Sequence, residues 1–372
     1  MPTRASAADP DSTDLEGRIY QRISGSPGEA ITLAEFMRMA LYDSDEGYYA
    51  SGRARIGREG DFFTSVSVGE CFGMLIARWI ARVMGEGAVA GSSTFDLVEL
   101  GAFDGTLADD ILRWLPEFVD AAWWERVRYT IVEPFFPLRT RQAEKLHRHG
   151  ERVRWVDGLS ALHATPVHGV VLSNELLDAM PVRQFLRTER GWSERVVTGD
   201  GETGLSFVER DVDAAHVSCL PDQAAVGSVI ERIDGLQDFF RRTASSLKSG
   251  RLLFFDYGFV EEEKPAGLIR KESLRAYRRH EALEEVLSLP GKADLTASVD
   301  FSDVAKAAVE AGLRYRPLND QHRFLTEVAK PWLRGLESGG MDDESAKLLR
   351  QFQTLTHPGD MGRKFRVFEA ER

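Results

Sequence analysis

Residues Phe95–Thr106 of this 372-residue chain have the sequence FDLVELGAFDGT and carry its clearest fold signal. The first six of these residues form a short apolar run that predicts a buried β-strand, and a helical pattern follows from Leu107 to Leu115. Glycines between the two let a ligand approach the backbone, and a helix N-terminus offers unpaired N–H donors. The stretch therefore predicts a strand, a turn and a helix with a ligand site at the turn.

Further apolar runs repeat this pattern along the chain. We expect strands at Tyr129–Glu133, Val153–Val156, Gly169–Ser173 and Leu252–Asp256, with a helix at Arg139–Arg148 between the first two. Strands that alternate with helices imply right-handed crossovers and a parallel sheet. The predicted fold class is α/β, with a doubly wound sheet.

The length allows either two ordinary domains or one large core with insertions, at about 150 residues per domain. Leu33, Phe36 and Met37 recur at helical spacing near the start of the chain, whereas residues from about 183 alternate apolar and polar. The predicted segments are a disordered tail (1–14), a helical N-terminal cap with a glycine-rich, aromatic loop (15–90) and an α/β core (91–372). Within the core we expect a β-hairpin insertion at about 183–225, a helical insertion at about 260–300, and late strands at 313–318 and 364–368.

Composition excludes several classes of function. The net charge of −12 argues against a nucleic-acid partner, because such partners need a net basic face. No apolar run approaches the ~20 residues of a membrane span, so no membrane partner is expected. Cys71 and Cys219 lie far apart and the eight histidines are scattered, which predicts a reducing compartment and no metal site. We expect a cytoplasmic protein, with a tail rather than a secretion signal at residues 1–14.

Acidic residues end the first two predicted strands. Glu99 suits a ligand that carries an ammonium group, and Glu133 can accept both hydroxyls of a ribose. S-adenosylmethionine has both groups, whereas the GxGxxG pattern of dinucleotide-binding proteins is missing. The alternative is that Gly101 and Gly105 are ordinary turn glycines and both glutamates are strand-end surface acids. Asp157, just after the third strand, is either an adenine ligand or another strand-end acid.

A second polar cluster, Asn174, Glu175 and Asp178, follows the fourth predicted strand. The carboxyl ends of parallel strands line the ligand crevice of a doubly wound sheet, so these side chains should face it. Two carboxylates there can orient a cationic nucleophile. The alternative is a helix N-terminus, capped by Asn174 and with its dipole balanced by the two acids.

Taken together, the motifs resemble those of the MidA-type class I methyltransferases, from about residue 18 to residue 370. This family includes the mitochondrial protein-arginine methyltransferase that assists assembly of respiratory complex I. The matching blocks are Phe36-Met37, Ala40–Asp43, Gly47–Tyr49, Gly60–Thr64, Phe72-Gly73, Val98–Gly101, Asn174–Phe185, Asp256–Phe259, Asp294–Ala297 and Val299–Phe301. The resemblance implies a Rossmann-like methyltransferase sheet, S-adenosyl-L-methionine as cofactor and a protein arginine as acceptor.

Residue roles follow from the strand ends and from the resemblance together. The expected cofactor-binding residues are Gly60, Asp61, Glu99, Gly101, Asp104, Gly105, Glu133, Asp157 and Asn174. The expected catalytic residues are Asn174, Glu175 and Asp178, because a guanidinium must be oriented and must lose a proton. The expected partner is a protein with basic residues or a small-molecule methyl acceptor, and a homodimer is left open.

Three departures from the family pattern fall in the cofactor region. Phe103 stands where the family usually has a glycine, Val66-Ser67 replaces a Pro-Glu pair, and Pro134–Phe136 replaces small polar residues. The aromatic replacements favour a small-molecule acceptor as the second hypothesis. A scaffold protein of the same fold without turnover is a third hypothesis, and a nucleotide-dependent oxidoreductase is a fourth.

Overall fold

The computed structural model describes residues 14–54, 64–86, 93–217, 220–221, 224–260, 269–339, 342–359 and 361–372. The predicted tail at residues 1–14 therefore lies almost wholly outside the described residues. No helix among the described residues is both long and apolar enough to cross a bilayer.

The centre of the molecule is a mostly parallel sheet in the strand order β15-β17-β10-β5-β2-β3-β4. Its parallel strands are β2 (Phe95–Leu100), β3 (Val127–Val132), β4 (Val153–Val156), β5 (Val167–Asn174) and β10 (Leu247–Phe259). The chain runs outward from β2 to β4, then returns to place β5 and β10 on the other side of β2. This reversal between β2 and β5 is the topological switch point of a doubly wound fold, which confirms the predicted fold class.

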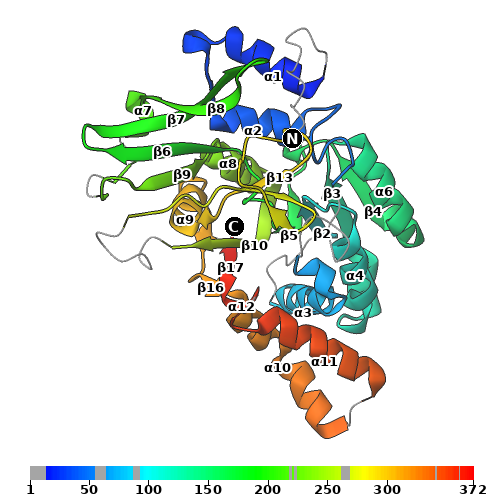
Figure 1. Ribbon diagram of the computed structural model, residues 1–372. Helices are drawn as coiled ribbons and strands as arrows, with labels where there is room; N and C mark the ends of the chain where they lie inside the picture. Colours follow the sequence, from blue (N-terminus) through cyan, green and yellow to red (C-terminus); the bar gives the residue numbers. More distant parts are fainter. Residues whose placement is uncertain are drawn as a thin grey trace.

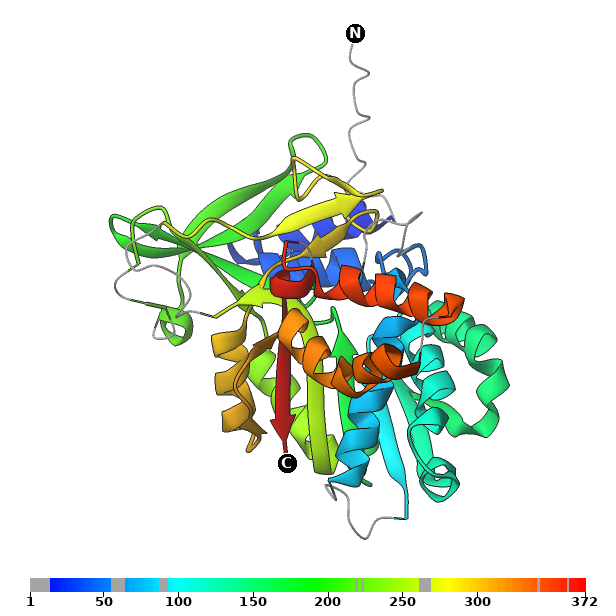
Figure 2. The ribbon, with the colours of Figure 1, turned by 90° about the horizontal axis from the view of Figure 1, so that it is seen from below.

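One edge of this sheet is antiparallel. The last strand, β17 (Phe365–Glu371), pairs with β10 from Arg251–Glu371 to Tyr257–Phe365. In Figure 2 the red β17 lies beside the yellow-green β10. Three short strands complete the edges, namely β14 (Val299–Asp300), β15 (Arg314–Tyr315) and β16 (Asn319–Asp320).

Helices cover both faces of the central sheet. A hydrophobic core lies on each face of the sheet, and alternate residues of β2 point into one or the other. Phe95 and Leu97 belong to the first core, and Val98 and Leu100 belong to the second. The first core is closed by α3 (Cys71–Gly85), α4 (Thr106–Trp114), α10 (Gln321–Gly339) and α11 (Asp343–Thr356). The second is closed by α8 (Leu236–Ser246) and α9 (Phe301–Glu310). The remaining core helices are α5 (Ala121–Arg126), α6 (Phe136–Leu146) and α12 (Met361–Lys364).

A second, antiparallel sheet carries the N-terminal helices. Its order is β1-β7-β6-β9, and β8 pairs with β7. The strands are β1 (Ile31–Thr32), β6 (Val182–Thr188), β7 (Gly191–Asp200), β8 (Gly204–Asp211) and β9 (Val229–Ile233), and the short helix α7 (Ala214–Val217) follows β8. Helices α1 (Leu15–Ser24) and α2 (Leu33–Tyr42) pack on this sheet through a shared apolar core, and Figure 1 shows both beside β6–β8. The stretch predicted as a hairpin insertion thus joins the N-terminal segment to the core.

The predicted helical insertion at about 260–300 is wrong for the described residues 269–300. They form β11 (Arg275–Arg278), β12 (Glu281–Ala282) and β13 (Asp294–Thr296), which pair in one small sheet, followed by β14. Leu274 and Ala276 are buried two positions apart, and Arg279 and His280 take positive φ in the turn after β11. Burial at every second residue is typical of a strand. The charged residues around these positions resemble a solvated helix face, which is why the sequence pattern predicts a helix.

Candidate active site

A cavity of about 690 Å3 opens at the carboxyl ends of β2, β3 and β5. It lies at the switch point of the sheet, where doubly wound folds bind their ligands, and its volume is typical of a small-molecule site. A wider hollow of about 810 Å3 between α3 and α10 includes none of the predicted site residues. The first cavity is therefore the candidate active site.

The glycine turn after β2 forms one wall of this cavity. Gly101, Phe103 and Gly105 have φ of 71°, 48° and 82°, all in the left-handed region. A Cβ on Gly101 would lie 3.0 Å from Leu176 Cδ1, so a larger residue would press on the turn after β5. Phe103 thus keeps the backbone shape that a glycine would adopt, at a strain of about 1 kcal/mol. Gly101 and Phe103 line the cavity, whereas Gly105 does not.

Glu99 reaches the cavity from the carboxyl end of β2. Its carboxylate accepts a hydrogen bond of 2.8 Å from the hydroxyl of Tyr129, and only 2% of the residue is exposed. Burial raises the pKa of Glu99 to about 7; the Tyr129 hydrogen bond lowers it and Asp104 raises it further. A raised pKa favours the protonated carboxyl, and a ligand cation beside it would favour the carboxylate.

Asp104 has structural contacts of its own. Its Oδ1 accepts from the backbone N–H and the hydroxyl of Thr106 at the start of α4, and its Oδ2 pairs with Lys145 at 2.5 Å. Asp104 lines the cavity. These contacts fix the turn between β2 and α4.

Glu133 follows β3 and is 3% exposed at the cavity wall. Its Oε1 accepts from the backbone N–H of Phe135 at 3.0 Å, and its Oε2 accepts from Gln142 Nε2 at 3.1 Å. Burial raises its pKa, and both hydrogen bonds lower it. The two donors hold the carboxylate in one orientation.

Gln142 on α6 is a site residue that the sequence did not indicate. Besides Glu133, its amide donates to the carbonyl of Phe103 at 2.9 Å and accepts from Trp155 Nε1 at 2.9 Å. It therefore ties the glycine turn to Glu133. A lone glutamine in a helix carries no sequence signal, so the structure alone reveals it.

Asn174 and Glu175 lie side by side at the end of β5 and line the cavity. Asn174 Nδ2 donates to Glu175 Oε1 at 2.7 Å, and the backbone N–H of Ser65 donates to the same oxygen at 3.3 Å. Asn174 Oδ1 is buried and has no hydrogen-bond partner among the described residues. Glu175 has φ of 53°, and burial together with Asp178 holds its pKa well above the usual value. The pair presents an unpaired acceptor and a protonatable carboxyl, and the backbone of Glu175 is strained.

Asp178 is buried behind the cavity wall and does not line it. Burial and the neighbouring Asp256 and Asp294 hold its pKa well above the usual range. Asp256 Oδ2 accepts the backbone N–H groups of Leu176, Leu177 and Asp178, the shortest at 2.7 Å. These bonds fix the turn that carries Glu175, so Asp178 and Asp256 act on the site through their neighbours.

The remaining predicted residues lie at the rim of the cavity or outside the described residues. Asp157 is at the rim, largely exposed, and forms an ion pair with Arg139. Gly60 and Asp61 lie outside the described residues. Of the replaced residues, Val66, Ser67, Pro134 and Phe135 line the cavity, whereas Phe136 is 78% exposed and does not line it.

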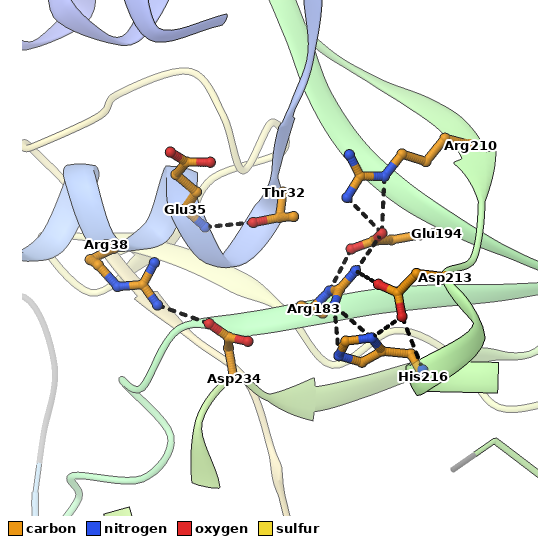
Figure 3. Close-up of polar contacts among 9 residues, drawn as sticks. All are labelled: Thr32, Glu35, Arg38, Arg183, Glu194, Arg210, Asp213, His216 and Asp234. Carbon is orange, nitrogen blue, oxygen red and sulfur yellow. Dashed lines mark hydrogen bonds and ion pairs between the residues drawn. The ribbon is translucent and has the colours of Figure 1, made fainter. Parts of the chain in front are cut away.

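The N-terminal segment closes the other side of the cavity. Arg38 on α2 reaches Asp234, just after β9, at 2.9 Å, and both line the cavity mouth (Figure 3). In the sheet beneath α2, Arg183 and Glu194 form two hydrogen bonds of 2.7 Å between β6 and β7, with Arg210, Asp213 and His216 around them (Figure 3). This buried pair fixes the sheet on which α2 rests.

A doubly wound sheet with a glycine turn after its first strand and an acid after its second defines a nucleoside-binding site of the class I methyltransferase kind. Residues 75–318 match the family described as "Putative S-adenosyl-L-methionine-dependent methyltransferase". The chain belongs to this family, is a methyltransferase and takes S-adenosyl-L-methionine as cofactor.

Relatives match the chain over nearly its whole length. The mitochondrial protein arginine methyltransferase NDUFAF7 of Rattus norvegicus is 30% identical over 91% of this chain and 80% of its own. The human protein of the same name is 29% identical over 97% and 84%. A crystal structure from Burkholderia thailandensis, bound to S-adenosyl-homocysteine, is 30% identical and superposes with a TM-score of 0.83 over 96% of this chain and 92% of that one.

Proposed function

We propose that this protein transfers the methyl group of S-adenosyl-L-methionine to an arginine guanidinium of a protein. The observation that carries the proposal is the pair Asn174–Glu175 with Asp178 behind it. Among the described residues, neither Glu175 nor Asp178 has an ion pair with a lysine or arginine. Buried carboxyls without a cation favour a cationic ligand. Curated relatives are named protein arginine methyltransferases, and the net charge of −12 favours a basic partner.

The residues on one side of the cavity fit the cofactor. Glu133, held by Phe135 and Gln142, would accept the ribose hydroxyls, and Glu99 would pair with the ammonium group. The glycine turn lets the methionine part approach the backbone at Gly101, and Asp104 fixes that turn. Asp157 at the rim is the proposed adenine ligand. The cofactor supplies a methyl group that its sulfonium already activates, so the contribution of the protein is positioning.

The residues on the other side would orient and deprotonate the acceptor. The unpaired Oδ1 of Asn174 would accept one guanidinium N–H, and Glu175 would pair with the cation. Glu175 would take the guanidinium proton as the nitrogen bonds to the methyl carbon and the bond from that carbon to the sulfonium sulfur breaks, which leaves S-adenosyl-homocysteine. A guanidinium beside Glu175 would lower the pKa that burial has raised, so the carboxylate forms when the acceptor binds. Asp178, which does not line the cavity, acts as a positioning residue.

A small-molecule methyl acceptor is the second candidate. Phe103 and Phe135 both line the cavity and give it apolar surface that would also suit a small molecule. The exposure of Phe136 removes one of the three aromatic residues on which this hypothesis rests. A cytoplasmic location is a further part of the proposal; the NDUFAF7 relatives are named mitochondrial.

Methyl transfer into a cell lysate that lacks this protein tests the proposal. With radiolabelled S-adenosyl-L-methionine we expect a labelled protein whose hydrolysate contains labelled methylarginine. Glu175→Gln should abolish the labelling, because the amide cannot take a proton. Asp110→Asn, which changes a buried carboxyl on α4 outside the cavity, should retain it. Label confined to small molecules would contradict arginine as the acceptor and support the second candidate.

A further inference from the structure

Three aromatic rings stand in one near-parallel row along the cavity wall. Tyr42 lies between Tyr49 and Phe135, with ring centroids 5.7 Å and 6.2 Å apart and interplanar angles of 19° and 7°. All three residues line the cavity. The row combines residues from the N-terminal segment with one that follows β3, and none of its three rings takes part in the cofactor binding or the acceptor deprotonation proposed for the site.

The local sequence fixes the two tyrosines. Tyr42 ends α2, and the backbone N–H groups of Tyr48 and Tyr49 donate to the carbonyls of Ala40 and Leu41, both at 3.0 Å. A Cβ on Gly47 would lie 2.5 Å from the backbone nitrogen of Asp43, so only glycine permits this fold-back onto the helix end. The motif Gly47–Tyr49 thus places Tyr49 against Tyr42.

The row runs between the two halves of the site. At one end the hydroxyl of Tyr49 donates to Asp294 Oδ1 at 2.8 Å, and Asp294 is among the carboxyls that act on Glu175 and Asp178. In the middle the hydroxyl of Tyr42 donates to the carbonyl of Ala179 at 2.9 Å. At the other end Phe135 follows Glu133, whose carboxylate its own backbone N–H binds. A group bound along the row would lie between the carboxyl cluster and the residues that fit the cofactor.

We propose that Tyr42 and Tyr49, with Phe135, form the acceptor-binding wall and select a flat, delocalised cation, a guanidinium, over a lysine ammonium. This inference rests on the proposed function and names the residues that determine its specificity. Stacking at centroid distances of 5.7 Å and 6.2 Å is offset, which leaves part of each ring face uncovered. Aromatic faces attract cations, and a guanidinium also stacks on them and gives up its weak hydration readily. An ammonium is compact and strongly hydrated, so it gains less from the same wall. The acids behind the wall attract either cation, and the rings distinguish between them.

Binding of capped amino acids to the full chain saturated with S-adenosyl-homocysteine tests this inference. The probes are N-acetyl-arginine methylamide and N-acetyl-lysine methylamide, and ligand-observed NMR titrations give their dissociation constants. For the unaltered protein we expect the arginine probe to bind about tenfold more tightly than the lysine probe. Tyr42→Leu should remove most of that preference, whereas Tyr42→Phe, which keeps the ring, should retain it.

Two further variants complete the design. Tyr49→Leu should act like Tyr42→Leu and gives a second result if one variant fails to fold, as judged by thermal unfolding. Tyr315→Leu is the matched control, because Tyr315 also stacks on a phenylalanine, Phe368, but does not line the cavity. An arginine preference that survives both cavity leucine variants would overturn the inference and leave the proposed function intact. Absence of binding of the arginine probe to the unaltered protein would contradict both.

Discussion

Phe103 occupies a backbone position that favours glycine, and the surrounding contacts explain why the turn tolerates it. Its carbonyl accepts from Gln142, and the guanidinium of Arg141 lies 5.5 Å from its ring centroid. These contacts hold a φ of 48° that most side chains avoid. The turn therefore keeps at Phe103 a positive φ of the kind that glycine adopts.

Substitution of Phe103 should reveal this backbone strain. Phe103→Val should reduce the free energy of unfolding by at least ~1 kcal/mol more than Phe103→Gly, because β-branched residues disfavour positive φ most and glycine adopts it freely. Denaturant titrations of the two variants give the comparison. Equal stabilities would show that the turn relaxes to a negative φ and would contradict the described geometry.

Glu99 should make stability depend on pH. Its pKa is raised from 4.5 to about 7, so the neutral form is favoured by folding. This contribution is fully present below about pH 4.5 and is lost as the pH rises through about 7. Relative to Glu99→Gln, which stays neutral, the unaltered protein should lose on the order of 3 kcal/mol between pH 5 and pH 8. A difference between the two proteins that does not change with pH would contradict a buried, protonated Glu99.

At the scale of elements, strand prediction succeeds where burial is continuous. β2 is buried at every position and β5 at nearly every one, and their apolar runs stand out in the sequence. The segment around β11 shows the opposite case, because one face is charged and only Leu274 and Ala276 mark the other. The pairing of β1 with β7 joins residues more than 160 positions apart, and no local pattern predicts such a contact.

The pair Arg183–Glu194 should govern the stability of the antiparallel sheet. Glu194 is 1% exposed and accepts from Arg183 and Arg210. Glu194→Ala should cost about 3–5 kcal/mol of unfolding free energy, because it leaves the buried Arg183 without its main partner. Glu209→Ala, on exposed β8, should cost about 0–1 kcal/mol. Similar losses in both variants would show that the buried pair has no special role.

For the whole molecule, the sequence predicts which strand ends meet but not what closes the cavity over them. Glu99, Glu133, Asn174 and Glu175 converge as the parallel-strand rule requires. Asp178 lies behind the wall because the turn fixed by Asp256 directs it away from the cavity. Tyr42, Tyr49 and Gln142 reach the site through tertiary packing of segments whose sequence patterns indicate only helices and loops.

We propose that the carboxyl ends of β2 and β3 hold the cofactor and that the turn after β5 serves the acceptor. Calorimetric titration with S-adenosyl-homocysteine of the unaltered protein, Glu133→Ala and Asp178→Ala tests this claim. Glu133→Ala should weaken binding about tenfold or more, because it removes a charge-assisted bidentate contact, and Asp178→Ala should change it less. The reverse order of the two dissociation constants, or no binding to the unaltered protein, would contradict the claim.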